Sequence, residues 1–184
     1  SIAERKLTYW VTVQKFRDMK PYQDPFTLAG EINFELDYHI RVNVRSPQAG
    51  HLYILNEGPA ETSQEPEFVV VFPSPTANQG AALLRAEQLV QIPERTWLKF
   101  DAQQGVETLW LVFAEDAIPE LESVKAFANP RDKGLITDVS QTRVVKDFLH
   151  KSSLPKATSE KSDKETTVKA PGKLLVHAIK LEHH

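Results

Sequence analysis

The clearest structural signal in this chain is the stretch Tyr38-His39-Ile40-Arg41-Val42-Asn43-Val44-Arg45. Apolar and polar side chains alternate along it, and successive side chains of a β-strand point to opposite faces of a sheet. One face would contact the core and carry Tyr38, Ile40, Val42 and Val44. The other face would meet water and carry His39, Arg41, Asn43 and Arg45. The stretch therefore predicts a strand with one buried and one solvated face.

Further strands are indicated on both sides of this one by β-branched and aromatic residues that stand between turn signals. They cover Leu7–Gln14, His51–Asn56, Phe68–Phe72, Gln88–Ile92, Trp97–Asp101, Val106–Ala114 and Lys173–Leu181. The link Ser46–Gly50 contains Pro and Gly, as hairpin loops do, so we expect Tyr38–Arg45 and His51–Asn56 to pair antiparallel. Val106–Ala114 is apolar on both faces, which favours a central position in a sheet.

Two helices are predicted late in the chain. Pro119 begins the first, with acidic residues in its first turn, and we expect it to end near Asn129. The second covers Asp138–Lys151, where Asp138 can cap the first turn. Its apolar stripe consists of Val144, Val145, Phe148 and Leu149. Both helices are expected to dock on the sheet or on its end.

Three segments lack a packed pattern. Residues 57–67 are rich in Gly, Pro, Glu and Ser, which predicts a mobile loop. Residues 152–170 consist mainly of Lys, Ser, Thr and Glu, which predicts a flexible linker before a C-terminal strand. Residues 181–184 either continue that strand or are the remnant of a purification tag.

The order of these elements predicts a mainly β fold, an antiparallel β-sandwich or an open barrel of about seven to eight strands with two late helices. The chain has 184 residues, of which 41% are hydrophobic and 26% are charged, as is typical of a globular domain. We therefore expect residues 1–184 to form a single β-rich domain.

The composition excludes several kinds of chemistry. Without Cys there is no disulfide, thiolate metal site or cysteine nucleophile. The Gly residues form no phosphate-binding loop, and no motif of a zinc protease, serine hydrolase or kinase occurs, so we expect no catalytic residue, metal or cofactor. A net charge of −3 gives no field that would attract nucleic acid. No apolar run reaches the length of a membrane span.

His39, Arg41 and Arg45 form a candidate recognition strip on the wet face of their strand. Two Arg residues four positions apart on a strand lie about 13 Å apart. They could therefore bind separate anionic groups of a small ligand or a protein partner. Trp97 joins the set because it alternates with charged residues, which turns its flat ring toward solvent. The alternative is an ordinary charged strand face, with Trp97 in the core.

Two other groups of residues are candidates for a metal site or a catalytic site. His39 and His51 sit on strands expected to be neighbours, but no third ligand at a telling spacing completes a metal site, and two surface histidines are the simpler interpretation. Acidic residues crowd the start of the first helix and could supply the acid pair of a glycosidase. They are Glu115, Asp116, Glu120 and Glu122. Complementing the helix dipole is their simpler role.

Five short segments follow one another in a recognisable order. They are Gly50–Asn56, Val70–Pro75, Asn78, Leu89–Pro93 and Val106–Val112. Together they resemble the bacterial domain of unknown function 4384 family over roughly Ile32 to Ala114. One departure is Arg85-Ala86-Glu87, where that family usually has a Gly.

The resemblance implies an accessory domain. Domains of that family often follow bacterial serine/threonine kinase domains or accompany caspase-like peptidase modules, and the matching segments carry no catalytic residue. The resemblance also favours the bacterial cell envelope or an extracytoplasmic location. We therefore expect a non-enzymatic binding or sensory module of a bacterial signalling or cell-envelope protein. The alternatives are a structural interaction domain that packs on its parent protein and a hydrolase that uses the acids near Glu115.

Overall fold

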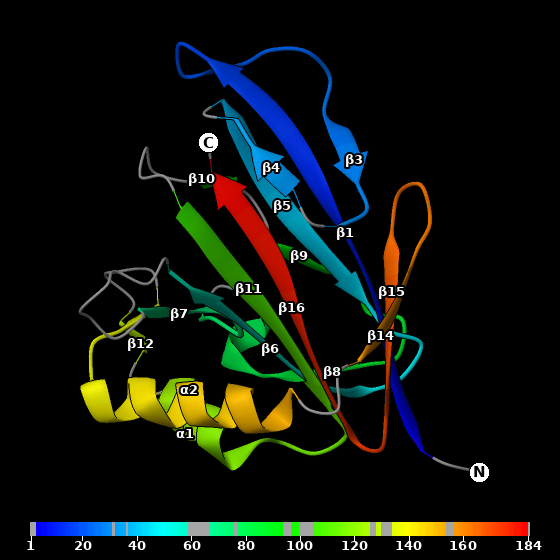
Figure 1. Ribbon diagram of the computed structural model, residues 1–184, viewed down its shortest axis with the longest axis vertical. Coiled ribbons are helices and arrows are strands. Elements are labelled where there is room, and N and C mark those ends of the chain that lie inside the picture. Colours follow the sequence, from blue (N-terminus) through cyan, green and yellow to red (C-terminus); the bar gives the residue numbers. More distant parts are fainter. Residues whose placement is uncertain are drawn as a thin grey trace.

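Two β-sheets pack face to face, and two helices cover the outer face of one of them (Figure 1). The computed structural model describes residues 3–30, 32–35, 37–58, 67–75, 77–93, 97–99, 105–125, 128–129, 134–153 and 157–183. The described strands do not close into a barrel. Of the two predicted architectures, the mainly β sandwich with two late helices is therefore confirmed.

The first sheet, called the β1 sheet, is built around the long strand β1 (Glu4–Arg17). Its order is β10 (Leu98–Lys99), β5 (Tyr38–Arg45), β1, β15 (Thr166–Pro171) and β14 (Thr158–Lys161). Three short strands join it at the sides, namely β2 (Lys20–Pro21), β3 (Phe26–Leu28) and β9 (Val90–Ile92). Every one of these pairings is antiparallel.

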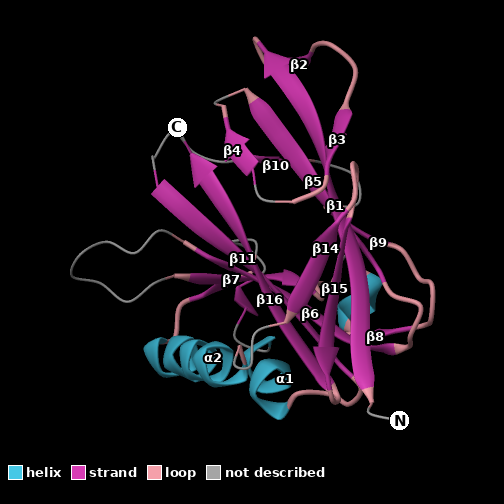
Figure 2. Ribbon diagram, turned by 45° about the vertical axis from the view of Figure 1, so that its right-hand side comes forward, coloured by secondary structure: helices cyan, strands magenta, loops and turns pink. Residues whose placement is uncertain are grey.

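The second sheet, called the β11 sheet, lies between the β1 sheet and the helices (Figure 2). Its order is β12 (Ala128–Asn129), β13 (Leu135–Ile136), β7 (Phe68–Phe72), β6 (Gly50–Glu57), β11 (Gly105–Ala114), β16 (Leu174–His183) and β4 (Ile32–Phe34). The short strand β8 (Leu83–Leu84) also pairs with β6, just after the 3-10 turn η1 (Asn78–Gly80). Only the β4 edge is parallel among the described pairings. The prediction that Val106–Ala114 is central is confirmed.

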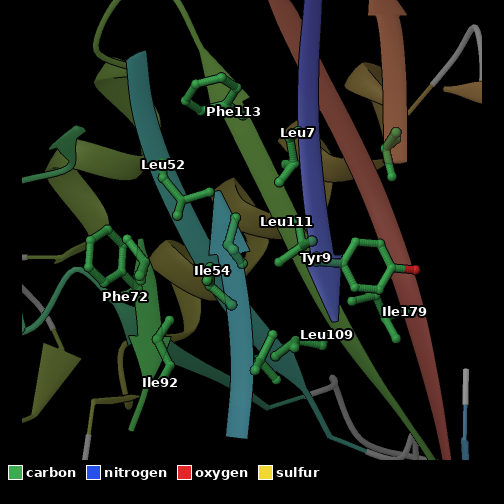
Figure 3. Close-up of a cluster of buried hydrophobic side chains, with 14 of the residues drawn as sticks. Leu7, Tyr9, Leu52, Ile54, Phe72, Ile92, Leu109, Leu111, Phe113 and Ile179 are labelled. Atoms are coloured by element: carbon green, nitrogen blue, oxygen red, sulfur yellow. The ribbon is translucent and has the colours of Figure 1, made fainter. Parts of the chain in front are cut away.

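The main core fills the space between the two sheets. Figure 3 shows side chains of β1, β6, β11 and β16 gathered there, including Leu7, Ile54, Leu111 and Ile179, each 0% exposed. A second core lies on the other side of the β11 sheet, where Tyr53, Leu55 and Val112 meet the helices. The β11 sheet is thus buried on both faces, which explains its nearly continuous apolar strands.

The helices agree with the prediction in position and differ in length. α1 (Pro119–Lys125) stops before Asn129, which instead belongs to the short strand β12. α2 (Val139–Ser152) begins after Asp138, whose carboxylate accepts a hydrogen bond from the backbone N–H of Gln141 at 3.1 Å, so the predicted cap is confirmed.

The predicted hairpin of Tyr38–Arg45 and His51–Asn56 is wrong. β5 pairs with β1, β9 and β10, whereas β6 pairs with β7, β8 and β11 in the opposite sheet. Residues 46–49 therefore cross from one layer of the sandwich to the other. The reason is burial: β5 has a polar outer face and suits the solvated sheet, whereas residues 52–55 of β6 are buried on both faces.

The predicted linker also differs from the structure. Within residues 152–170, β14 forms a hairpin with β15, and β15 pairs with β1 from Glu4↔Pro171 to Tyr9↔Thr166. Thr166, Val168 and Ala170 alternate toward the buried side of β15, and Val168 and Ala170 join the main core. Residues 59–66 of the predicted loop 57–67 lie outside the described residues. At the C-terminus β16 continues through His183, and Leu181 is buried in the core.

Candidate functional site

The outer face of the β1 sheet carries the predicted recognition residues. Ile40, Val42 and Val44 of β5 point into the core, so the intervening side chains point outward. The β1–β5 register sets His39 opposite Gln14, Arg41 opposite Thr12 and Arg45 opposite Thr8. We call the outward residues His39, Arg41, Asn43 and Arg45, with the rings of Trp10, Phe16 and Trp97, the cation–aromatic strip.

Arg41 and Trp97 form the closest cation–π pair of the strip. The guanidinium carbon of Arg41 lies 4.0 Å from the centroid of the Trp97 ring, and both residues are half-buried. The pairing of Leu98 in β10 with Ile40 in β5 brings Trp97 to this position. The structure therefore brings together two residues that the sequence placed in one candidate set without predicting their contact.

Arg45 lies at the other end of the strip. Its guanidinium carbon is 5.5 Å from the centroid of the Trp10 ring, and its Nε is 3.9 Å from a carboxylate oxygen of Glu87. The side chains of Arg45 and Glu87 are 45% and 66% exposed, so this ion pair contributes little to stability. Arg45 thus lies against a ring and remains accessible from solvent.

His39 stacks on Phe16, a residue that the sequence interpretation did not select. The two ring centroids are 4.0 Å apart and the ring planes differ by 17°. Phe16 lies past the predicted end of the first strand at Gln14, because β1 continues to Arg17. Continuing the alternation of β1 through Thr12 and Gln14 would have placed Phe16 on this outer face.

Asn43 lies at the centre of the strip, between Arg41 and Arg45. It is 5% exposed, and its amide nitrogen donates to the backbone oxygen of Trp10 at 3.3 Å and to the hydroxyl of Thr12 at 3.1 Å. These bonds join β5 to β1 between the Arg41 and Arg45 ends of the strip. The arrangement is therefore a row of charged or ionisable groups stacked on rings and supported by a rigid strand pair.

His39 and His51 do not come together, because their strands belong to different sheets. His51 has its Nδ1 3.2 Å from the backbone oxygen of Glu115, at the helix side of the molecule. In the described part of the chain, no cluster of three or more potential ligands could hold a metal ion.

The acidic residues near α1 have structural contacts. Glu115 pairs with Lys173 at 3.7 Å on the surface. Glu122 accepts a hydrogen bond from the hydroxyl of Tyr53 at 2.6 Å and pairs with Lys125 at 2.7 Å. Partial burial acts to raise the pKa of Glu122, but the hydrogen bonds from Lys125 and Tyr53 outweigh it and hold that pKa below its usual value. The side chain of Glu122 thus fastens α1 to β6 as a carboxylate.

Burial and the hydrogen bond to Glu122 together raise the pKa of Tyr53 well above its ordinary range. Its hydroxyl also accepts a hydrogen bond from the backbone N–H of Ile118 at 3.1 Å, just before α1. Trp110 is half-buried against the helix-side core, and its indole N–H donates to Glu57 at 3.3 Å. Tyr53 thus links the β11 sheet to the start of α1, whereas the Trp110–Glu57 bond joins β11 to β6 within the sheet.

Comparison with known proteins finds no family model, curated protein or solved structure that matches this chain. Among the described residues, neither helix is long and apolar enough to cross a membrane.

Proposed function

We propose that this chain is a non-enzymatic binding or sensory module of a bacterial signalling or cell-envelope protein, and that the cation–aromatic strip contacts an acidic segment of a partner. One observation carries the proposal: His39, Arg41 and Arg45 each lie against an aromatic ring from another part of the chain. The sequence resemblance supports the accessory role, and the cation–aromatic strip supports the contact surface.

Stacking prepares a guanidinium for binding. A ring under the face of Arg restricts its many rotamers, while the N–H donors lie in the guanidinium plane and are not consumed by the ring. Because fewer rotamers are lost when a carboxylate arrives, more of the interaction energy becomes affinity. Arg41 and Arg45 are separated by about 13 Å along the strand, so they suit an extended acidic segment better than a single small anion.

A structural role on the parent protein is the second candidate. It is favoured by the half-buried rings of Trp10 and Trp97 on the same face, since aromatic residues are enriched where proteins pack together. Such packing would depend on apolar area and would be insensitive to salt. Recognition of an acidic segment through Arg41 and Arg45 would weaken as salt screens the charges.

The experiment is a titration of the purified chain with a fluorescein-labelled decaglutamate peptide, followed by fluorescence anisotropy at low and high salt. Arg41→Ala and Arg45→Ala should each weaken binding by about 1 to 3 kcal/mol, and the loss should shrink at high salt. Arg143→Ala, an exposed Arg on α2, is the matched control and should bind as the parent does. Affinity that survives the double change Arg41→Ala with Arg45→Ala would refute the proposal.

A further inference from the structure

Arg5 occupies an unusual place at the end of the sandwich. It lies on β1 with the same orientation as Leu7 and Tyr9, so its side chain enters the layer between the sheets. This is the end where the start of β1 lies beside the turn between β15 and β16, at the bottom of Figure 1. There the backbone N–H of Gly172 donates to the oxygen of Ala3 at 2.6 Å. Arg5 is only 9% exposed.

The immediate surroundings of its guanidinium are a ring, a carbonyl and a glycine. The guanidinium carbon lies 5.1 Å from the centroid of the Phe113 ring, and Nη1 donates to the backbone oxygen of Ala49 at 2.7 Å. Gly50 leaves room for this approach: a Cβ on Gly50 would lie 2.7 Å from Nη1 of Arg5 and 2.8 Å from the oxygen of Ala114. The backbone is therefore shaped around the guanidinium.

What Arg5 lacks is a counter-charge. No carboxylate of the described residues forms an ion pair with it. A guanidinium has five N–H donors, and among the described residues only the backbone oxygen of Ala49 accepts a hydrogen bond from that of Arg5. Removing a cation from water without an anionic partner costs several kcal/mol, and buried polar groups in proteins are nearly always satisfied. The site is therefore short of an acceptor.

We propose that Arg5 anchors a second binding site, for a small oxyanion of the carboxylate or phosphate type. The planar fork of N–H donors matches such a group in bidentate geometry. Phe113 covers one part of the guanidinium and Ala49 holds one donor, so the fork is fixed in orientation before the anion arrives. This site is independent of the cation–aromatic strip, because Arg5 faces the inside of the sandwich and the strip faces outward.

Thermal unfolding tests the site with defined anions. The melting temperature is measured with increasing sodium phosphate, sodium acetate and sodium chloride at one constant ionic strength. Phosphate or acetate should raise it saturably, by about 5 to 10 °C at a hundred times the Kd for a domain of this size. Stabilisation by phosphate alone assigns a phosphate group as the ligand, and stabilisation by acetate alone assigns a carboxylate. Equal melting temperatures in all three salts would overturn the proposal.

Variants locate the effect at Arg5. Arg5→Met keeps the apolar stem and should lose the anion-dependent rise, whereas the exposed Arg143→Met should retain it. Arg5→Lys keeps the charge but lacks the fork, so it should show a reduced rise. If neither Arg5 variant folds, nuclear magnetic resonance of the parent protein tests the site through the Nε–H signal of Arg5. A saturable shift of that signal on adding phosphate or acetate supports the site, and an unchanged signal refutes it.

Discussion

The guanidinium of Arg41 lies 4.0 Å from the ring centroid of Trp97, and this contact joins β5 to the residue that leads into β10. The two residues lie far apart in the chain and meet only because Leu98 pairs with Ile40. Cation–π contacts of this kind contribute from about 0.5 to 2 kcal/mol, with more at desolvated sites. Because both residues are half-buried, we expect the Arg41–Trp97 contact to contribute more stabilisation than the Arg45–Trp10 contact, in which Arg45 is more exposed.

The first prediction concerns that ring. Trp97→Ala removes the support of Arg41 and should weaken decaglutamate binding by about 0.5 to 2 kcal/mol. Trp97→Phe keeps a smaller ring and should weaken decaglutamate binding less than Trp97→Ala does. Denaturant unfolding of both variants controls for damage to the fold. If Trp97→Ala folds normally and binds as tightly as the parent, the ring does not organise Arg41 for binding.

The second prediction tests the segment that the sequence described as a linker. Val168 is 0% exposed in β15, and its neighbour Lys169 points to the outer face opposite Lys6. Val168→Asp should abolish cooperative unfolding, because an unpaired carboxylate would be buried between the sheets. Lys169→Asp should change stability by less than about 0.5 kcal/mol. Circular dichroism during urea unfolding makes the comparison. Two variants of equal, nearly unchanged stability would support an unpacked linker instead.

Sequence reasoning succeeded where a pattern is local. The alternation of Tyr38–Arg45 determines which side chains are buried, and so it placed His39, Arg41 and Arg45 together on an outer face as observed. The apolar run of Val106–Ala114 likewise indicated a strand with neighbours on both sides. These properties depend only on the period of side chains along one strand.

It failed where the outcome depends on distant partners. The Pro and Gly of Ser46–Gly50 suit a hairpin, but they suit a crossing between sheets equally well. The burial of both faces of β6 is what favours the crossing over the hairpin. The residues of β15 gave no strong strand signal because only Val168 and Ala170 of this strand belong to the main core, and its place is set by pairing with the distant strand β1. Arg5 carried no signal at all, since a single charged residue near the start of a chain is usually exposed.

The third prediction concerns the last strand. β16 pairs with β11 along its whole length and contributes Leu175, Ile179 and Leu181 to the main core. Each large side chain stabilises the fold by about 1.5 to 3 kcal/mol on burial, so a chain that ends at Ala170 would lose an amount comparable with the whole stability of a domain. It should show no cooperative melting transition.

A milder change in the same strand gives a graded result. Ile179→Ala should destabilise the protein by about 2 to 5 kcal/mol, whereas the exposed Lys180→Ala should have a much smaller effect. Urea unfolding compares the two. A truncated chain that melts like the parent would mean that β16 is dispensable.

The last prediction uses the pH dependence of the Glu122 contact. Its hydrogen bonds from Lys125 and Tyr53 prevail over partial burial and lower its pKa in the folded protein, so the folded state favours the carboxylate more than the unfolded state does. The resulting stabilisation is fully present above the unfolded pKa of about 4.3 and is lost as the pH falls through the lower, folded value. Glu122→Gln should therefore destabilise the protein by about 1 kcal/mol at pH 7 and by clearly less at pH 3. Glu120→Gln, exposed on the same helix, is the control and should show no such difference. Urea unfolding at the two pH values measures the stability of both variants. If Glu122→Gln lowers the free energy of unfolding equally at pH 7 and pH 3, the charge on Glu122 does not fasten α1 to β6.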